Sequence, residues 1–119
     1  RALGRSVGVD VVSAAFDAPG TPDAVAVTIG ALPGGVDAGP GIRPFAENGG
    51  LLVDVVYGTW PTPLAEQWRA AGNTAINGLP MLLHQALLQV RVFVGGDPAV
   101  PLEREDDVLA AMRAAVMGG

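Results

Sequence analysis

Two short segments carry side chains that could contact a small ligand. Tyr57 follows a mostly apolar run at residues 51–56, and its hydroxyl can both donate and accept a hydrogen bond. Val55 and Tyr57 are two residues apart, so they point to the same side of a strand at its carboxyl end, where open α/β sheets bind ligands. Met81 and Gln85 are four residues apart, so they share one face of a helix near its N-terminus. The spacing therefore predicts a ligand site at the carboxyl edge of a sheet.

Each of these residues also has an ordinary structural explanation. Tyr57 could be an aromatic residue at a strand end that packs on a loop, Gln85 a partly exposed helix residue and Met81 a filler of the core. His84, the single histidine, is adjacent to Gln85 and points elsewhere on the helix, so we interpret it as a packing or surface residue. We also interpret Asp54, inside an apolar strand, as structural, with a backbone group or an arginine as its partner.

Composition excludes several classes of protein. Half of the 119 residues are hydrophobic and 16% are charged, which argues against a disordered chain. The net charge is −5 and the seven basic residues are scattered arginines, so no basic stripe indicates nucleic acid. No apolar run approaches the ~20 residues that span a bilayer. Cysteine is absent, and the acidic residues 103–107 fit a helix start rather than a metal site. We expect a soluble cytoplasmic protein that binds neither metal, nucleic acid nor membrane.

Strands alternate with helices along the chain. Continuous or β-branched apolar runs predict strands at residues 9–12, 23–30, 51–56 and 74–77. Helical patterns and end signals predict helices at residues 1–7, 43–48, 62–71, 79–94 and 102–117. Uniformly apolar strands of this kind are typical of a parallel sheet that is buried on both faces. Trp60 and Trp68 flank the third helix, and we expect them to pack on the surface of the domain.

The predicted strands and helices match only the second half of a dinucleotide-binding domain. A dinucleotide-binding sheet opens with a strand, a G-x-G-x-x-G turn and a helix whose N-terminus holds the pyrophosphate. The glycines at positions 30, 34, 35, 39 and 41 do not form that turn, and no initiator methionine begins the chain. We therefore predict a partial Rossmann-like parallel sheet, the second half of a doubly wound domain with C-terminal helices, and expect the Gly-rich loop to belong to absent upstream sequence.

Two motifs resemble the shikimate dehydrogenase family. Residues 54–64 (DVVYGTWPTPL) are similar to the family's strand, tyrosine, short loop and Thr-Pro-Leu helix start. Residues 78–86 (GLPMLLHQA) are similar to its Gly-Leu-Gly-Met-Leu-x-x-Gln-Ala helix, in the same order and at the same spacing. The resemblance implies that residues 1–119 are the C-terminal part of a dinucleotide-binding domain, including helices 79–94 and 102–117, without the family's N-terminal substrate domain.

The resemblance also implies roles. Tyr57 and Gln85 would bind the substrate, shikimate or 3-dehydroshikimate. The backbone at Val55 and Gly78 and the side chain of Met81 would contact the nicotinamide end of NADP. The family's catalytic lysine and aspartate come from the N-terminal substrate domain, and this chain contains no lysine, so no catalytic residue is assigned here. An inactive isolated chain is the expectation.

Departures from the family pattern leave alternatives open. Asn77 replaces an aspartate, Pro80 replaces a glycine, and Ala31 stands where the family often has a threonine that contacts the cofactor. A quinate-using dehydrogenase shares these motifs, and a non-catalytic binding or assembly module derived from such an enzyme is a further alternative. In either case the strand at 23–29 would have an unpaired edge. We expect this edge to drive self-association or pairing with the missing N-terminal half.

Overall fold

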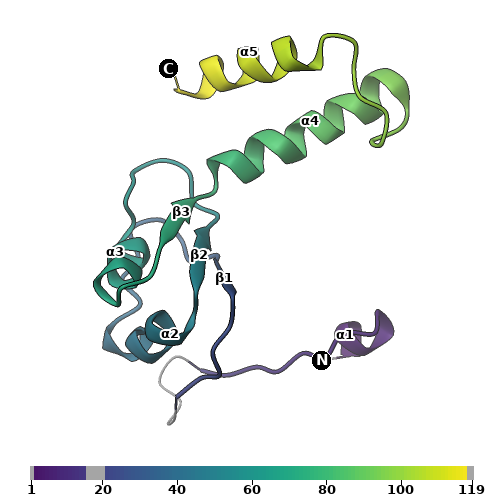
Figure 1. Ribbon diagram of the computed structural model, residues 1–119. Helices are drawn as coiled ribbons and strands as arrows, with labels where there is room; N and C mark the ends of the chain where they lie inside the picture. The colour runs from purple at the N-terminus through teal and green to yellow at the C-terminus, as the bar shows by residue number, and fades with distance from the viewer. Residues whose placement is uncertain (1, 16–20, 118–119) are drawn as a thin grey trace.

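Three short parallel strands form one open sheet. The computed structural model describes residues 2–15 and 21–117. The elements in chain order are α1 (Ala2–Ser6), β1 (Val27–Gly30), η1 (Pro40–Ile42), α2 (Arg43–Asn48), β2 (Leu51–Asp54), α3 (Pro63–Ala70), β3 (Ala75–Asn77), α4 (Leu79–Gly95) and α5 (Glu105–Met117). The strand order is β1-β2-β3, with β2 parallel to both neighbours (Figure 1). The predicted α/β class with a parallel sheet is confirmed.

The residues predicted to begin and end helices do so in α3 and α4, the helices that follow β2 and β3. Thr62 caps α3, because its Oγ1 accepts a hydrogen bond from the Ala65 N–H at 3.1 Å, and Pro63 occupies the first position of the helix. α4 ends at Gly96, whose φ of 76° places it in the left-handed region. The Gly96 N–H donates to Val92 O at 2.9 Å, which satisfies one of the last carbonyls.

The core lies between the sheet and the α2–α3 layer. Figure 1 shows both helices on the same face of the strands. Trp68 of α3 is 1% exposed and donates its indole N–H to Gly50 O at 2.9 Å. Our expectation that Trp68 packs on the surface is therefore wrong, because α3 turns this side chain toward β2. The buried apolar cluster contains Ile42, Ala46, Leu52, Leu64, Ala65, Trp68 and Ala75.

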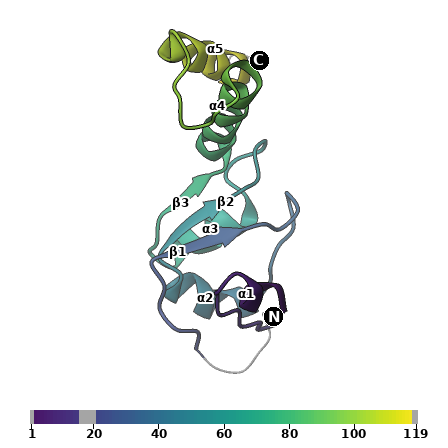
Figure 2. The ribbon, with the colours of Figure 1, turned by 90° about the vertical axis from the view of Figure 1, so that its right-hand side faces the viewer.

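The opposite face of the sheet is open. The register aligns Ile29, Val53 and Ile76 across the three strands, and successive side chains alternate between faces. Ile29 is 70% and Ile76 41% exposed, and Val27 is also exposed. Figure 2 looks toward this face and shows the strands without α2 or α3 in front of them. The prediction of strands buried on both faces is wrong for the described residues, since their helices cover only one face of the sheet.

Several predicted elements also differ from the structure. The strand predicted at 51–56 ends at Asp54, so the prediction that Val55 and Tyr57 lie on a strand is wrong. Residues 9–12 form no strand: the Val9 N–H donates to Gly4 O at 2.8 Å, and none of the described strands pairs with them. The predicted strand at 23–30 is hydrogen-bonded as a strand only from Val27. The last helix begins at Glu105 rather than residue 102, because Arg104 has a non-helical φ of 56°.

α4 and α5 extend beyond the sheet as a helical hairpin (Figures 1 and 2). The radius of gyration is 17.6 Å, whereas a compact domain of this length has about 13–14 Å. The accessible surface is 8103 Å², against about 6,000 Å² for a compact monomer of 12.0 kDa. Among the described residues, no helix combines the length and the apolar character that crossing a membrane requires.

Candidate functional site

The carboxyl ends of the three strands meet at one edge of the sheet, and the predicted residues lie there. Beyond the end of β2, the Val55 N–H donates to Gly30 O at 2.9 Å and continues the ladder with β1. Tyr57 follows in the loop to α3 and is 57% exposed. β3 leads directly into α4, whose first turns carry Met81 and Gln85. The parallel topology therefore brings the two predicted segments to the same edge.

Gly78 is packed against the backbone of Val55. A Cβ at Gly78 would lie 2.8 Å from Val55 C, Cα and O, a separation that real Cβ atoms essentially never show. The Gly78 N–H also donates to Val56 O at 3.4 Å, and its own carbonyl accepts from the Leu82 N–H at 2.9 Å. Glycine is thus the residue that lets the start of α4 touch the end of β2. The structure brings together the two positions predicted to contact the cofactor through their backbone.

A buried carboxylate fixes the loop that carries Tyr57. Asp54 is 1% exposed, and its Oδ2 accepts a hydrogen bond from the Thr62 hydroxyl at 2.6 Å. Its Oδ1 accepts from the Val56 N–H at 3.3 Å. Both ends of the loop between β2 and α3 are therefore held by one side chain. The structural interpretation of Asp54 is confirmed, although its side-chain partner is a threonine and not an arginine.

The α4 residues are exposed to different extents. Met81 is 45% exposed, whereas Gln85 is half-buried. The Gln85 amide has local partners: its Nε2 donates to Leu82 O at 3.1 Å, and its Oε1 accepts from Gln89 Nε2 at 2.7 Å. The Nε2 retains a second N–H and the Oε1 a second lone pair, so a ligand hydroxyl could bond to Gln85 without breaking either bond. Among the hydrogen bonds of the described residues, none joins Gln85 to Tyr57.

Two departures from the family pattern have structural consequences. Asn77 still holds the start of α4, because its Oδ1 accepts from the Leu79 N–H at 3.1 Å. Pro80 occupies an early helix position where its missing N–H has no intrahelical partner to lose. The substitution of an amide for a carboxylate at position 77 therefore preserves the helix start and leaves the Asn77 Nδ2 as a donor.

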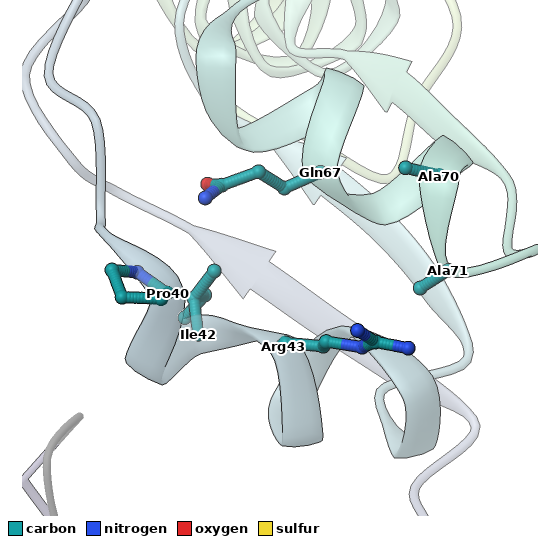
Figure 3. A pocket seen from close by; sticks show the side chains of 6 residues that line it. All are labelled: Pro40, Ile42, Arg43, Gln67, Ala70 and Ala71. Carbon is teal, nitrogen blue, oxygen red and sulfur yellow. The ribbon is translucent and has the colours of Figure 1, made fainter.

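A hollow beside α3 lies away from these residues. A cavity of about 370 Å³ separates η1 and the start of α2 from the second half of α3, and none of the predicted site residues lines it. Figure 3 shows Gln67 reaching from α3 toward Pro40 and Ile42. The Gln67 Nε2 donates to Asp37 Oδ1 and Gly39 O, both at 3.2 Å, so this amide supports the loop before η1. We assign no ligand to this cavity.

Within residues 2–15 and 21–117, no group of three or more histidine, cysteine, aspartate or glutamate side chains is arranged to hold a metal ion. His84 is exposed and lies about 100° around α4 from Gln85.

Comparison with known proteins gives consistent results. No protein-family model matches the chain. It is 36% identical over 76 residues to a protein named shikimate dehydrogenase (NADP(+)) from a Synechococcus species, a match that covers 58% of this chain and 26% of that protein. The protein of the same name from Rhodospirillum rubrum is 40% identical over 78 residues, which covers 66% of this chain and 23% of that protein.

A solved structure agrees with these sequences. The crystal structure of a shikimate 5-dehydrogenase from Mycobacterium fortuitum matches with a TM-score of 0.50 and 35% identity, over 76% of this chain and 30% of that chain. The resemblance predicted from residues 54–64 and 78–86 is confirmed. The chain spans less than a third of the length of each of these proteins.

Proposed function

We propose that this chain, a relative of the shikimate dehydrogenases, is the C-terminal part of such an enzyme and forms the nicotinamide side of its NADP site. The enzyme would interconvert shikimate and 3-dehydroshikimate. The observation that carries the proposal is the contact between Gly78 and the Val55 backbone. This contact joins the end of one strand to the start of the next helix, at the edge where open α/β sheets bind ligands.

The residues at this edge fit a flat ring. Val55 is half-buried and Met81 half-exposed, so both offer apolar surface, and Tyr57 adds a hydroxyl. When bound, the nicotinamide cofactor supplies or accepts the hydride. The chain's own residues orient the reactants: Met81 packs on the ring, and the Tyr57 hydroxyl and the Gln85 amide bind substrate hydroxyls. The preference for shikimate over quinate, and for NADP, rests on the names of the relatives.

The side chains that transfer the proton have to come from outside this chain. The sequence contains no lysine, and the family resemblance assigns the catalytic lysine and aspartate to the substrate domain. Hydride transfer without a proton partner or a pyrophosphate site would not turn over. We therefore expect the purified 119-residue chain to reduce no NADP in the presence of shikimate, judged by the absorbance of the reduced cofactor against a blank without protein.

A chimera tests the proposal. Residues 23–117 replace the matching segment of the Synechococcus enzyme, and the expected product oxidises shikimate with NADP. In this chimera Gln85→Ala raises the KM for shikimate several-fold and leaves that for NADP nearly unchanged, since one hydrogen bond is worth about 0.5–1.5 kcal/mol. Gly78→Val abolishes activity, and Gly95→Ala, where an added Cβ meets no atom within 4 Å, retains it. A folded but inactive chimera would contradict the proposal.

The open face of the sheet is an argument for a partner that covers it. The chain exposes about 2,000 Å² more than a compact monomer of its mass, and each side of a standard interface buries about 800 Å². β1 is also an edge strand with exposed Val27 and Ile29 side chains. This edge and face would pair with the other half of the dinucleotide-binding domain, or with a second copy where that half is absent. An immobilised N-terminal half of the Synechococcus enzyme should retain this chain on a column, and no retention would count against the pairing.

A further inference from the structure

The α4–α5 hairpin is fastened at one end by an ion pair. Arg91 Nε donates to Glu105 Oε2 at 2.7 Å, and Arg91 Nη2 donates to Glu105 Oε1. The Arg91 guanidinium also donates to Pro98 O at 2.9 Å, and the Leu102 N–H donates to Glu105 Oε2 at 3.0 Å. These bonds fix the antiparallel register of the two helices. About two helical turns further from the connection, the same register sets Arg113 opposite His84.

A cavity occupies the other end of this hairpin. It has a volume of about 260 Å³ and lies where the start of α4 faces the last turns of α5. Its walls are mainly apolar, formed by Leu79, Pro80, Leu83 and Met117. Its polar groups come from three elements: Asn77 at the end of β3, His84 of α4 and Arg113 of α5. This volume lies just below the range of about 300–1,000 Å³ that is usual for small-molecule pockets, so only a small ligand would fit.

Arg113 gives the cavity a positive charge, and none of the described carboxylates pairs with it. Within the described part of the chain, Arg43, Arg91 and Arg104 form ion pairs, whereas Arg113 forms none. No aspartate or glutamate lines the cavity, and residues 78–96 and 108–117 contain none. The acidic residues of α5 all lie in its first turn, at the fastened end. An anion at Arg113 would therefore meet no carboxylate from either helix.

We propose that this cavity binds a small carboxylate that carries a five- or six-membered ring. The planar guanidinium of Arg113 pairs with the carboxylate, for which its fork of donors is suited. The His84 imidazole and the Asn77 Nδ2 donate the further hydrogen bonds, since the Asn77 Oδ1 is engaged by the Leu79 N–H. The ring packs on the walls formed by Leu79, Pro80 and Leu83.

This site is separate from the proposed nicotinamide site. Pro80, Leu83 and His84 lie on a face of α4 that is rotated well over 90° from the face with Met81 and Gln85. A ligand in the cavity would contact the first turns of α4 from the α5 side and so join the open end of the hairpin. The site goes beyond the proposed function and does not depend on it.

Benzoate is the probe for this site, and benzamide, of the same shape but uncharged, is its control. Titration of the 15N-labelled chain with benzoate should give saturable shifts of the backbone amides that line the cavity, and benzamide should give none. Arg113→Met should weaken benzoate at least about tenfold, because hydrogen bonds to charged groups are the strong ones. Arg5→Met removes an exposed arginine of α1, outside the cavity, and should leave binding unchanged.

Two results would overturn the proposal. The first is equal binding of benzoate and benzamide, and the second is unchanged benzoate affinity in Arg113→Met. Should Arg113→Met lose the dispersed spectrum of a folded chain, Arg113→Lys takes its place. It retains the charge but loses the bidentate fork, so we expect it to bind benzoate more weakly than the parent chain but still measurably. Full affinity for benzoate would count against the site.

Discussion

The two faces of the sheet have similar residues and opposite environments. On one face Leu52 is completely buried beneath α3, and Trp68 of that helix belongs to the same buried cluster. On the other face Ile29 and Ile76 remain 70% and 41% exposed, although they belong to the same three strands. The strand sequences therefore specify a sheet covered on both sides, and the described helices cover only one. We therefore propose the open face as the surface that a partner covers.

Truncations on the two faces should have very different effects on stability. Trp68→Ala removes the largest buried side chain and the indole bond to Gly50, which should cost about 3–5 kcal/mol of unfolding free energy. Ile29→Ala on the open face should change it by no more than about 0.5 kcal/mol at chain concentrations low enough that no second copy covers this face. Urea unfolding followed by circular dichroism measures both. Comparable losses would mean that the open face is covered in solution.

Gly78 joins the two regions at the carboxyl edge, so we expect the next largest effect there. Gly78→Ala forces the start of α4 away from the Val55 backbone and should cost about 1–3 kcal/mol, as overpacking does. Gly95→Ala is the matched control, because an added methyl meets no atom within 4 Å there and alanine favours a helix. Equal thermal stability of the two variants would argue against the close contact.

Thr62 ties the covering helix of the closed face to the sheet. Thr62→Ala removes both the cap of α3 and the hydroxyl bonded to buried Asp54, and should cost about 1–2 kcal/mol. Thr62→Ser retains the hydroxyl and should recover most of this loss. A serine variant as unstable as the alanine variant would assign the effect to the lost methyl group. Chemical denaturation of the three proteins distinguishes these outcomes.

The α4–α5 hairpin extends beyond the sheet, and we expect acid to destabilise it more than mutations in the core do. The hydrogen bonds from Arg91 and from the Leu102 N–H lower the pKa of Glu105 from 4.5 to about 2. A lowered pKa in the folded chain means that this interaction stabilises the hairpin above pH 4.5 and is lost as the pH falls toward 2.

The Glu105 titration can be observed directly. The carbon resonance of the Glu105 carboxyl group should titrate near pH 2, and Arg91→Met should move the midpoint toward the ordinary value of about 4.3. As a control, Arg104→Met removes only the exposed pair with Asp107 and should leave that midpoint in place. A Glu105 midpoint near 4.3 in the parent chain would mean that the hairpin is not fastened in solution.

Local signals in the sequence predicted the helices well. The α2 bounds, the Thr62 cap and the left-handed end of α4 follow from proline, threonine and glycine at positions with strong local preferences. The candidate site followed from the family spacing, and the structure adds the contact of Gly78 with Val55. The roles of the predicted site residues toward ligands remain predictions.

Long-range features were beyond the sequence. The run at 9–12 has strand-like residues but no neighbouring strand, and a strand exists only where a partner supplies its hydrogen bonds. Trp68 was predicted at the surface because a residue type does not reveal which face of α3 meets β2. The approach of Arg113 to His84 depends on the register that the pair between Arg91 and Glu105 sets, which no local pattern encodes.

Light scattering of the isolated chain across a range of concentrations tests the central claim most directly. A second copy can cover the open face when the other half of the domain is absent, so the account predicts a mass above the 12.0 kDa of one chain, rising with concentration. Ile29→Lys places a charge on the open face and should return the chain to a single-chain mass, and Val94→Lys, at an exposed position of α4, should not. A parent chain that stays a folded monomer at high concentration, with a mass indistinguishable from Ile29→Lys, would contradict the account.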